Sequence, residues 1–301
     1  MDLKAFTEFC EKEKIEYVCQ EPMCCHTSFK IGGPADIFVT IKNCDELKNV
    51  ILQLKKNEIP YMIIGKGSNL LVSDKGIEGA VISLSKLDEI SVSGQEIKVG
   101  AGAKLALLCK AALDNSLSGL EFGFGIPGAV GGAVYMNAGA YGGEIKDCIV
   151  SCEYLDVDGE IKTIKAEDMA LGYRTSIFKS NDKIILSATF KLEKGDKTLI
   201  KAKMEDFLSR RKEKQPLEYP SAGSTFKRPE GHFAGALIEK NNLKGVTVGG
   251  AQVSCKHAGF VINKGSATAE DVLNLIEKIK ETVLRNDNVE LCTEVIFVGR
   301  K

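Results

Sequence analysis

The chain has 301 residues, which at roughly 150 residues per domain corresponds to about two domains. Its 40 Lys and Arg residues nearly balance its 41 Asp and Glu residues, so the net charge is -1 and no overall field is available to hold a polyanion. Binding to nucleic acid or to a membrane surface is therefore not expected. Hydrophobic residues make up 44% of the chain, which supplies ample material for a core and argues against disorder.

No stretch of the sequence approaches the ~18 consecutive apolar residues that a membrane-spanning helix requires. The N-terminal residues mix acids and bases with a helical apolar pattern, which is unlike a signal peptide. We therefore expect a cytoplasmic protein.

The ten cysteines and three histidines do not show the spacing of a metal site. Cys24 and Cys25 are adjacent, no C-x-x-C pair is present, and no cysteine pair stands beside His26, His232 or His257. We expect no metal, and we expect the cysteines to be reduced thiols that pack as small hydrophobic residues.

Three stretches have the apolar spacing of helices that face a core. The first is capped by Asp45 and ends before Pro60, the second covers residues 200–212, and the third starts with a capping box of Thr268 and Asp271. Short β-rich runs lie between them, with a hairpin turn at Asp158-Gly159. Strands are expected at 35–41, 61–64, 79–84, 97–99, 149–157, 183–192, 246–253, 258–262 and 289–298.

A first glycine-rich segment, residues 65–71, directly follows the apolar run 61–64. Glycines allow backbone N–H groups to converge on an anion such as a pyrophosphate. The segment is not a Rossmann fingerprint, because Leu70 replaces the third glycine and strand and turn residues follow where a helix is required. The Walker A pattern is also absent from the sequence.

A second glycine-rich segment, residues 123–143, consists mostly of small residues with almost no charge. A tightly packed helix of small residues is one explanation, and a flexible linker is another, although linkers do not carry Ile, Pro, Val, Met and Tyr. The interpretation we favour is backbone pressed against a large flat ligand, where longer side chains would clash.

Several motifs, taken together and in order, resemble the family of UDP-N-acetylenolpyruvoylglucosamine reductases, which are flavoproteins of the vanillyl-alcohol oxidase type. The resemblance covers nearly the whole chain from about residue 20. Its motifs are residues 26–36, 65–69, 125–140, 173–178 and 222–227, and finally Glu294.

The resemblance implies an α+β fold, in which a two-part FAD-binding domain of the vanillyl-alcohol oxidase type precedes a smaller α+β substrate-binding domain. We place the first domain at residues 1–195, split near residue 60 into two α+β subdomains, and the second at 196–301. It also implies noncovalent FAD, NADPH as reductant, a small-molecule UDP-sugar substrate and a role in peptidoglycan synthesis. A monomer is expected.

The family pattern assigns cofactor contacts to both glycine-rich segments and substrate contacts to three other residues. The cofactor set is Gly65, Lys66, Gly67, Ser68, Asn69, Leu70, Gly125, Ile126, Pro127, Gly128, Gly131, Gly132, Asn137, Ala138, Gly139 and Ala140. The substrate set is Tyr173, Lys214 and Lys227, with Lys214 expected at the diphosphate.

The family reaction reduces an enolpyruvyl ether to a lactyl ether, and three residues suit its demands. Arg174 offers a permanently charged planar fork for the substrate carboxylate and for the charge that develops there. Glu294, buried beside that charge, would be driven toward its protonated form and could donate a hydrogen bond. Ser224 would supply a proton to the carbanion, which is basic enough to take one from a hydroxyl.

One feature departs from the longer members of the family, since the interval after Arg174 is too short for the inserted segment that carries their substrate-clamping tyrosine. The chain therefore resembles the short form. Two alternatives stay open: an oxidase of the same superfamily that uses dioxygen, and a noncatalytic nucleotide-sugar binder, which would be colourless.

Overall fold

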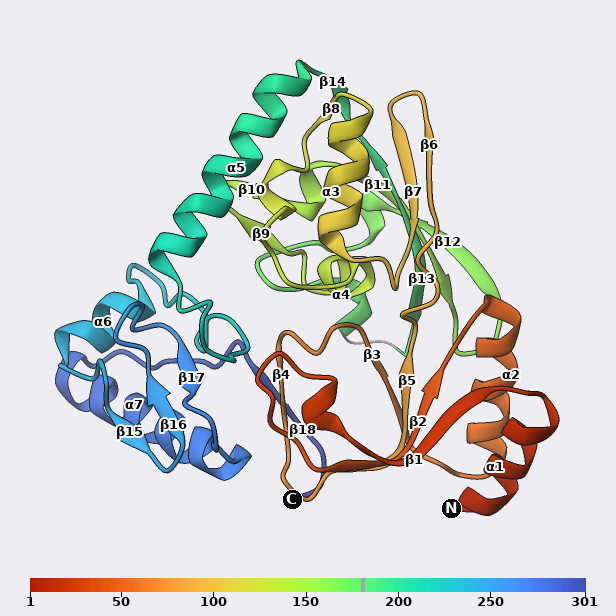
Figure 1. The fold of residues 1–301 in the computed structure, drawn as a ribbon, viewed down its shortest axis with the longest axis horizontal. Coiled ribbons are helices and arrows are strands. Elements are labelled where there is room, and N and C mark those ends of the chain that lie inside the picture. Colours follow the sequence, from red (N-terminus) through yellow and green to blue (C-terminus); the bar gives the residue numbers. More distant parts are fainter. Residues whose placement is uncertain (180–181) are drawn as a thin grey trace. The chain divides into compact units, whose positions relative to one another are not determined.

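The computed structural model describes residues 1–179 and 182–301, and their packing defines two compact units. Unit 1 comprises residues 1–18, 37–66 and 79–211, and unit 2 comprises residues 19–36, 67–78 and 212–301 (Figure 1). Each unit therefore draws on several separate stretches of the chain. The boundaries of these units differ from the expected division at residue 195. That division separates an FAD-binding domain from a substrate-binding domain, and it stays a prediction.

The chain passes from one unit to the other within three strands of a four-stranded sheet. The order of this sheet is β1 (Glu16–Pro22), β2 (Pro34–Thr40), β5 (Ile77–Ser83) and β3 (Tyr61–Ile64). Strands β3 and β5 are parallel, with Tyr61 opposite Ala80.

Unit 1 is built on a five-stranded antiparallel sheet in the order β12, β11, β13, β7 and β6 (Figure 1). The strands are β6 (Ile90–Ser93), β7 (Glu96–Gly100), β11 (Ile149–Leu155), β12 (Ile161–Lys165) and β13 (Ile184–Lys191). The central strand β13 has an apolar sequence and is buried along most of its length, as expected for a strand with neighbours on both sides.

Helices complete this unit. They are α1 (Leu3–Lys12), α2 (Cys44–Lys56), α3 (Leu105–Asp114), α4 (Val130–Tyr135) and α5 (Lys197–Lys214), the last of which ends in unit 2. Helix α4 packs against β13 and β7 as well as against α3. Two short pairs join β8 (Leu117–Ser118) to β14 (Glu193–Lys194) and β9 (Gly139–Ala140) to β10 (Gly143–Glu144).

Unit 2 contains a small antiparallel sheet, two helices and a parallel strand pair. The sheet consists of β15 (Thr247–Val248), β16 (Ala251–Val253) and β17 (Val261–Asn263), and helices α6 (Ala234–Lys240) and α7 (Ala269–Asp287) pack together. Strand β18 (Ile296–Val298) runs parallel to β4 (Leu70–Val72). This strand pair therefore connects residues near the end of the chain to residues near position 70.

The three predicted helices are confirmed, and two of them, α2 and α5, begin earlier than expected. The expected cap of α2 at Asp45 is wrong, because Asn43 occupies the capping position and its side chain accepts a hydrogen bond from the Glu46 N–H at 2.8 Å. Asp45 instead lies in the first turn, where its charge favours the helix N-terminus. The capping box of Thr268 and Asp271 on α7 is confirmed.

The expected strands of unit 2 are shorter than predicted. The run 246–253 is a hairpin rather than one strand, because Gly249-Gly250 forms the two-residue loop between Val248 and its partner Ala251. In the run 289–298, only the last part, β18, joins a sheet, and Thr293 forms an isolated bridge with Phe226. The Asp158-Gly159 hairpin between β11 and β12 is confirmed, with Gly159 at a φ of 78°.

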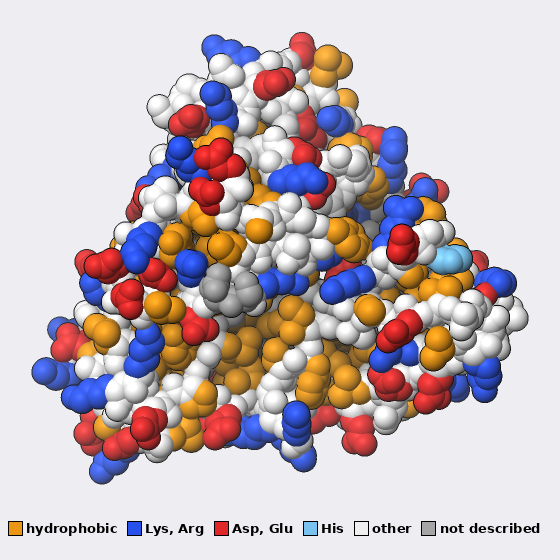
Figure 2. Space-filling view, turned by 180° about the vertical axis from the view of Figure 1, so that it is seen from behind, with side chains coloured by type: hydrophobic (Ala, Val, Ile, Leu, Met, Phe, Trp, Pro, Cys, Tyr) orange, Lys and Arg blue, Asp and Glu red, His pale blue; other side chains and the backbone are white. Residues whose placement is uncertain are grey.

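Acidic and basic side chains are interspersed over the face shown in Figure 2, as the near-zero net charge leads one to expect. None of the helices within residues 1–179 and 182–301 combines the length and apolar character that crossing a bilayer requires. Over the same ranges, no three His, Cys, Asp or Glu side chains gather as metal ligands would.

The expectation that the cysteines are buried is only partly right. Burial raises the pKa of the Cys148 and Cys152 thiols to about 12, so both stay protonated and pack as small apolar groups. Cys10 and Cys109 are also buried. By contrast, Cys19, Cys25, Cys255 and Cys292 are exposed, so the expectation is wrong for these four residues.

Candidate active site

The first glycine-rich segment lies against the motif that begins at His26. Gly67 has a φ of 57°, and a Cβ built on it would lie 2.2 Å from the His26 carbonyl oxygen. The Ser28 N–H donates to the Gly67 carbonyl at 3.3 Å. Gly67 is thus required both by its backbone conformation and by this close approach, which brings two of the five motifs together in unit 2.

The two glycine-rich segments meet within unit 1. A Cβ built on Gly65 would lie 3.4 Å from the Cβ of Ala129, at the start of α4. The backbone on either side is held firmly, since the Leu105 N–H donates to the Gly128 carbonyl at 3.0 Å and the Val130 N–H donates to the Ala103 carbonyl at 2.9 Å. The two segments therefore form one continuous piece of surface at this point.

The glycines of the second segment fall into two classes. Some are needed for packing inside the protein: a Cβ on Gly131 would lie 3.0 Å from the Ala101 Cβ, and a Cβ on Gly139 would lie 2.8 Å from the Glu144 Cβ. Gly132 is different, because it is exposed on α4 and a Cβ there would meet no protein atom within 4 Å. Exposed backbone at Gly65 and Gly132 suits close contact with the flat ring system and phosphates of FAD.

The remaining cofactor candidates flank α4. Residues 125–128 form the turn that leads into this helix, and residues 138–140 follow it and run into the β9–β10 hairpin. The explanation of this segment as a helix of small residues is thus correct for residues 130–135. The same helix also exposes Gly132 on its surface. Asn137 is only 1% exposed, and its side-chain amide donates to the Gly172 carbonyl and to Glu144. Asn137 is thus buried within unit 1, and its assignment to the cofactor stays a prediction.

In unit 2, hydrogen bonds to the main chain join Asn69, Glu294 and the turn that carries Ser224. The Asn69 side-chain amide donates to the Glu294 carbonyl at 3.0 Å, and the Ile296 N–H donates to the Asn69 carbonyl at 3.0 Å. The Glu294 N–H in turn donates to the Thr225 carbonyl at 2.8 Å. Glu294 is therefore fixed between the end of the first glycine-rich segment and the residue that follows Ser224.

The turn that carries Ser224 is anchored by its neighbour Thr225. Thr225 is 1% exposed, its hydroxyl accepts the Val261 N–H at 2.9 Å, and its N–H donates to the Gly259 carbonyl at 2.8 Å. Gly223, on the other side, has a φ of 78°. These contacts leave Ser224 exposed on a rigid turn, while Glu294 is half-buried.

Arg174 and Tyr173 occupy the tip of a tight turn in unit 1. The Arg174 guanidinium carbon lies 5.6 Å from the centre of the Tyr173 ring, and Tyr173 is 58% exposed. In unit 2, Lys214 and Lys227 are exposed, and the Lys227 N–H donates to the Cys292 carbonyl at 2.9 Å. Because Arg174 belongs to unit 1 and Ser224 to unit 2, their approach to one substrate stays a prediction.

Sequence reasoning missed a cluster of side chains that covers the second glycine-rich segment. The rings of Tyr141 and Phe207 stack at 4.7 Å, and Tyr141 also hydrogen-bonds to Arg211. Arg211 is partly buried against Gly125, and burial lowers the pKa of its guanidinium. Nothing in the sequence indicated that Arg211 is partly buried, and the apolar spacing of Phe207 gave no hint of an aromatic partner.

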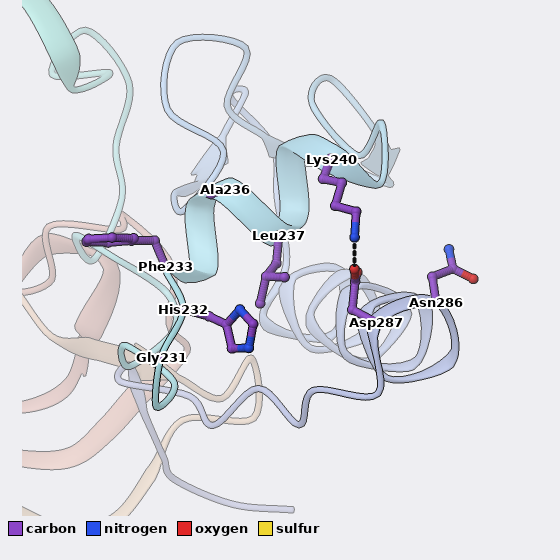
Figure 3. A pocket seen from close by; sticks show the side chains of 8 residues that line it. All are labelled: Gly231, His232, Phe233, Ala236, Leu237, Lys240, Asn286 and Asp287. Atoms are coloured by element: carbon purple, nitrogen blue, oxygen red, sulfur yellow. Dashed lines mark hydrogen bonds and ion pairs between the residues drawn. The ribbon is translucent and has the colours of Figure 1, made fainter.

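A cavity of about 530 Å³ opens in unit 2 beside the N-terminal half of α6 (Figure 3). Its lining includes His232, Phe233 and the ion pair of Lys240 with Asp287, and the Arg228 guanidinium carbon lies 4.0 Å from the centre of the Phe233 ring. Its lining contains no predicted catalytic or cofactor residue.

Comparison with known proteins identifies the family. Residues 215–298 match the model of the UDP-N-acetylenolpyruvoylglucosamine reductase C-terminal domain, and residues 35–165 match that of an FAD binding domain. The chain is 54% identical over 276 residues to the UDP-N-acetylenolpyruvoylglucosamine reductase of Clostridium novyi, covering 92% of this chain and 90% of that protein. It is 50% identical to the enzyme of the same name from Clostridium perfringens, over 99% and 97% of the two chains.

A solved structure supports the same assignment. The UDP-N-acetylenolpyruvylglucosamine reductase of Thermus caldophilus superposes with a TM-score of 0.80 at 37% identity, covering 94% of this chain and 98% of that one. The resemblance stated from the motifs is thus confirmed, and so is the expected pair of an FAD-binding domain and a smaller C-terminal domain. The chain belongs to the UDP-N-acetylenolpyruvoylglucosamine reductase family.

Proposed function

We propose that this protein reduces UDP-N-acetylglucosamine enolpyruvate to UDP-N-acetylmuramate for peptidoglycan synthesis, using FAD and NADPH. The observation that carries the proposal is the series of hydrogen bonds from Asn69 through the Glu294 backbone to Thr225, which fixes the Glu294 backbone and the Ser224 turn at the end of a glycine-rich loop. Supporting it are the family membership and the FAD-binding domain at residues 35–165.

The cofactor is held by backbone rather than by long side chains. Gly65 to Leu70 would hold the FAD phosphates, and the exposed face of α4 at Gly132 would hold its flat ring system. When bound, FAD accepts reducing equivalents from NADPH and delivers them to the double bond of the enolpyruvyl group.

The protein's own residues then manage charge and protons. Arg174 pairs with the substrate carboxylate through its planar fork and stabilises the charge that develops there during the reduction. Glu294 donates a hydrogen bond to the same carboxylate. Ser224 transfers the proton of its Oγ hydroxyl to the carbon next to that carboxylate. Because the Ser224 turn is rigid, the proton reaches one face only, as a chiral product requires.

Binding of the rest of the substrate falls to exposed side chains. Lys214 meets the diphosphate, and Lys227 and Tyr173 each contact the substrate. The protein acts as a monomer in the cytoplasm, on a small molecule and with neither nucleic acid nor membrane as partner.

The proposal is tested by separating the two half-reactions in the absence of dioxygen. In the Ser224→Ala variant we expect reduction of the flavin by NADPH at the wild-type rate, and reoxidation by the enolpyruvyl substrate slowed by about 10²- to 10⁴-fold, the usual contribution of a positioned proton donor. Ser221→Ala, which removes a hydroxyl from the same segment, serves as the control and should behave as wild type. An equal loss in both half-reactions would contradict the role given to Ser224, and rapid reoxidation by dioxygen alone would favour an oxidase.

A further inference from the structure

The turn that presents Arg174 is closed by two reciprocal main-chain hydrogen bonds. The Gly172 N–H donates to the Thr175 carbonyl at 3.1 Å, and the Thr175 N–H donates back to the Gly172 carbonyl at 3.2 Å. Tyr173 and Arg174 are therefore the two residues at the tip. Arg174 has a φ of 54°, a left-handed conformation that most residues avoid and that surrounding contacts must maintain.

The second glycine-rich segment supplies those contacts. The Asn137 side-chain amide donates to the Gly172 carbonyl at 3.0 Å, and the Ser176 hydroxyl donates to the Tyr135 carbonyl at 2.7 Å. The turn is thus held by one hydrogen bond at Gly172, before its tip, and by another at Ser176, after its tip. Both come from α4 or from the residues directly after it, which carry the proposed cofactor face.

The Asn137 side chain makes three hydrogen bonds inside unit 1. Its amide nitrogen donates one hydrogen to the Gly172 carbonyl and the other to the Glu144 carboxylate at 2.6 Å, and its oxygen accepts the Lys146 N–H at 2.9 Å. The Glu144 carboxylate is itself held by the Lys146 ammonium at 2.8 Å. Asn137 has a φ of 42°, which Asn tolerates better than most residues, so residue type and backbone agree at this position.

From this arrangement we infer that Asn137 is a positioning residue for Arg174. It links the backbone that holds the cofactor to the turn whose guanidinium holds the substrate carboxylate, and it acts on the substrate only through that turn. The inference rests on the proposed function, because it assumes that Arg174 meets the substrate.

A double-mutant cycle on the second half-reaction tests the inference. Asn137→Gly removes the amide while accepting the positive φ, so its effect reports the lost hydrogen bonds and not backbone strain. We expect flavin binding and reduction by NADPH to be retained, and reoxidation by the enolpyruvyl substrate to slow by on the order of 10- to 100-fold, as displacement of a binding group by about 1 Å does. In an Arg174→Ala background the same change should cost nothing further, because Asn137 acts through Arg174.

Each outcome of the cycle decides one question. If Asn137→Gly slows reoxidation by the same factor with and without Arg174, or only lowers the melting temperature, the positioning role is refuted. If Arg174→Ala itself leaves reoxidation unchanged, the proposed role of Arg174 is wrong instead. Should Asn137→Gly fail to bind FAD, the cycle is repeated with Asn137→Asp, which keeps the volume and the acceptor for the Lys146 N–H and loses both donors.

Discussion

Single glycines show what a sequence can and cannot reveal about this site. The clustering of glycines in residues 123–143 correctly indicated tight backbone approaches, but it did not show which of them face other parts of the protein. Gly131 and Gly139 have protein atoms within 3.0 Å of a built Cβ, whereas Gly132 has none within 4 Å. That distinction depends on which neighbour each residue meets: Gly131 meets Ala101, 30 positions earlier in the chain, and Gly139 meets Glu144 across the β9–β10 hairpin.

The cofactor face of α4 can be tested at Gly132. Replacing Gly132 by Leu should leave the apoprotein as stable as wild type or raise its stability by up to about 1 kcal/mol, because Leu favours helix and meets no neighbour at its Cβ. FAD affinity should fall by at least roughly tenfold, since overpacking a contact costs about 1–3 kcal/mol.

The two quantities are measured by thermal unfolding of the apoprotein and by titration with FAD. Gly131→Leu is the matched control on the same helix, because its side chain would meet Ala101 and should destabilise the apoprotein itself. An unchanged FAD affinity in Gly132→Leu would show that this face of α4 does not contact the cofactor.

The contacts of Asn137 could not be predicted from the sequence. The family pattern assigns Asn137 to the cofactor, whereas its side chain is buried and bonded to Gly172 and Glu144. Position 172 lies 35 residues further along the chain, so no local pattern could have indicated the contact.

Among the elements, the long helices were predictable and the short strands were not. Helices α2, α5 and α7 carry apolar side chains at helical spacing, and the burial of Leu47, Val50 and Leu54 on α2 follows that spacing directly. Strands such as β18 have only three residues, and their limits depend on a partner strand instead of their own sequence. The Gly249-Gly250 loop was a readable hairpin signal that was missed in the run 246–253.

The connection between β16 and β17 depends on a neutral histidine, which makes it sensitive to acid. His257 Nδ1 accepts the Gly259 N–H at 3.1 Å, and the His257 ring packs edge-on against Phe260 at 4.9 Å. Burial lowers the pKa of His257 below its ordinary value of 6.5, and the nearby Lys244 lowers it further, while Glu239 acts in the opposite direction. The unfolded chain therefore binds a proton more readily than the folded protein does.

It follows that part of the folding stability is present above pH 6.5 and is lost as the pH falls from 6.5 toward the lowered pKa of the folded state. In His257→Gln we expect lower stability at neutral pH and a weaker loss between pH 6.5 and 5. Urea unfolding at several pH values measures both. A variant with the same pH dependence as wild type would show that another group causes the acid sensitivity.

At the scale of the whole molecule, unit 2 cannot be obtained by cutting the chain once. Strand β18 pairs with β4, the two Asp36 carboxylate oxygens each accept a hydrogen bond from the Arg300 side chain at 2.7 Å, and Asp74 accepts the first N–H of α7 at 2.9 Å. Phe29 and Leu71 also belong to its core. Sequence reasoning placed a boundary near residue 195 because only local composition was available, whereas these contacts join residues about 190 to 260 positions apart.

A fragment of residues 196–301 should therefore fail to fold on its own. It lacks the partner of β18, the cap from Asp74 and the apolar side chains that Phe29, Ile31 and Leu71 contribute to the core. We therefore expect poorly dispersed amide resonances and no cooperative unfolding, in contrast to the full chain. A fragment that unfolds cooperatively would instead support the predicted division at residue 195.

The most direct measurement of the central claim is the visible absorption of the purified protein during anaerobic titration, first with NADPH and then with UDP-N-acetylglucosamine enolpyruvate. The account predicts a yellow protein that loses its colour on addition of one equivalent of NADPH and regains it on addition of one equivalent of the enolpyruvyl compound, with UDP-N-acetylmuramate as product. A protein that regains its colour only when dioxygen is admitted, or that shows no flavin absorption after incubation with FAD, would contradict the account.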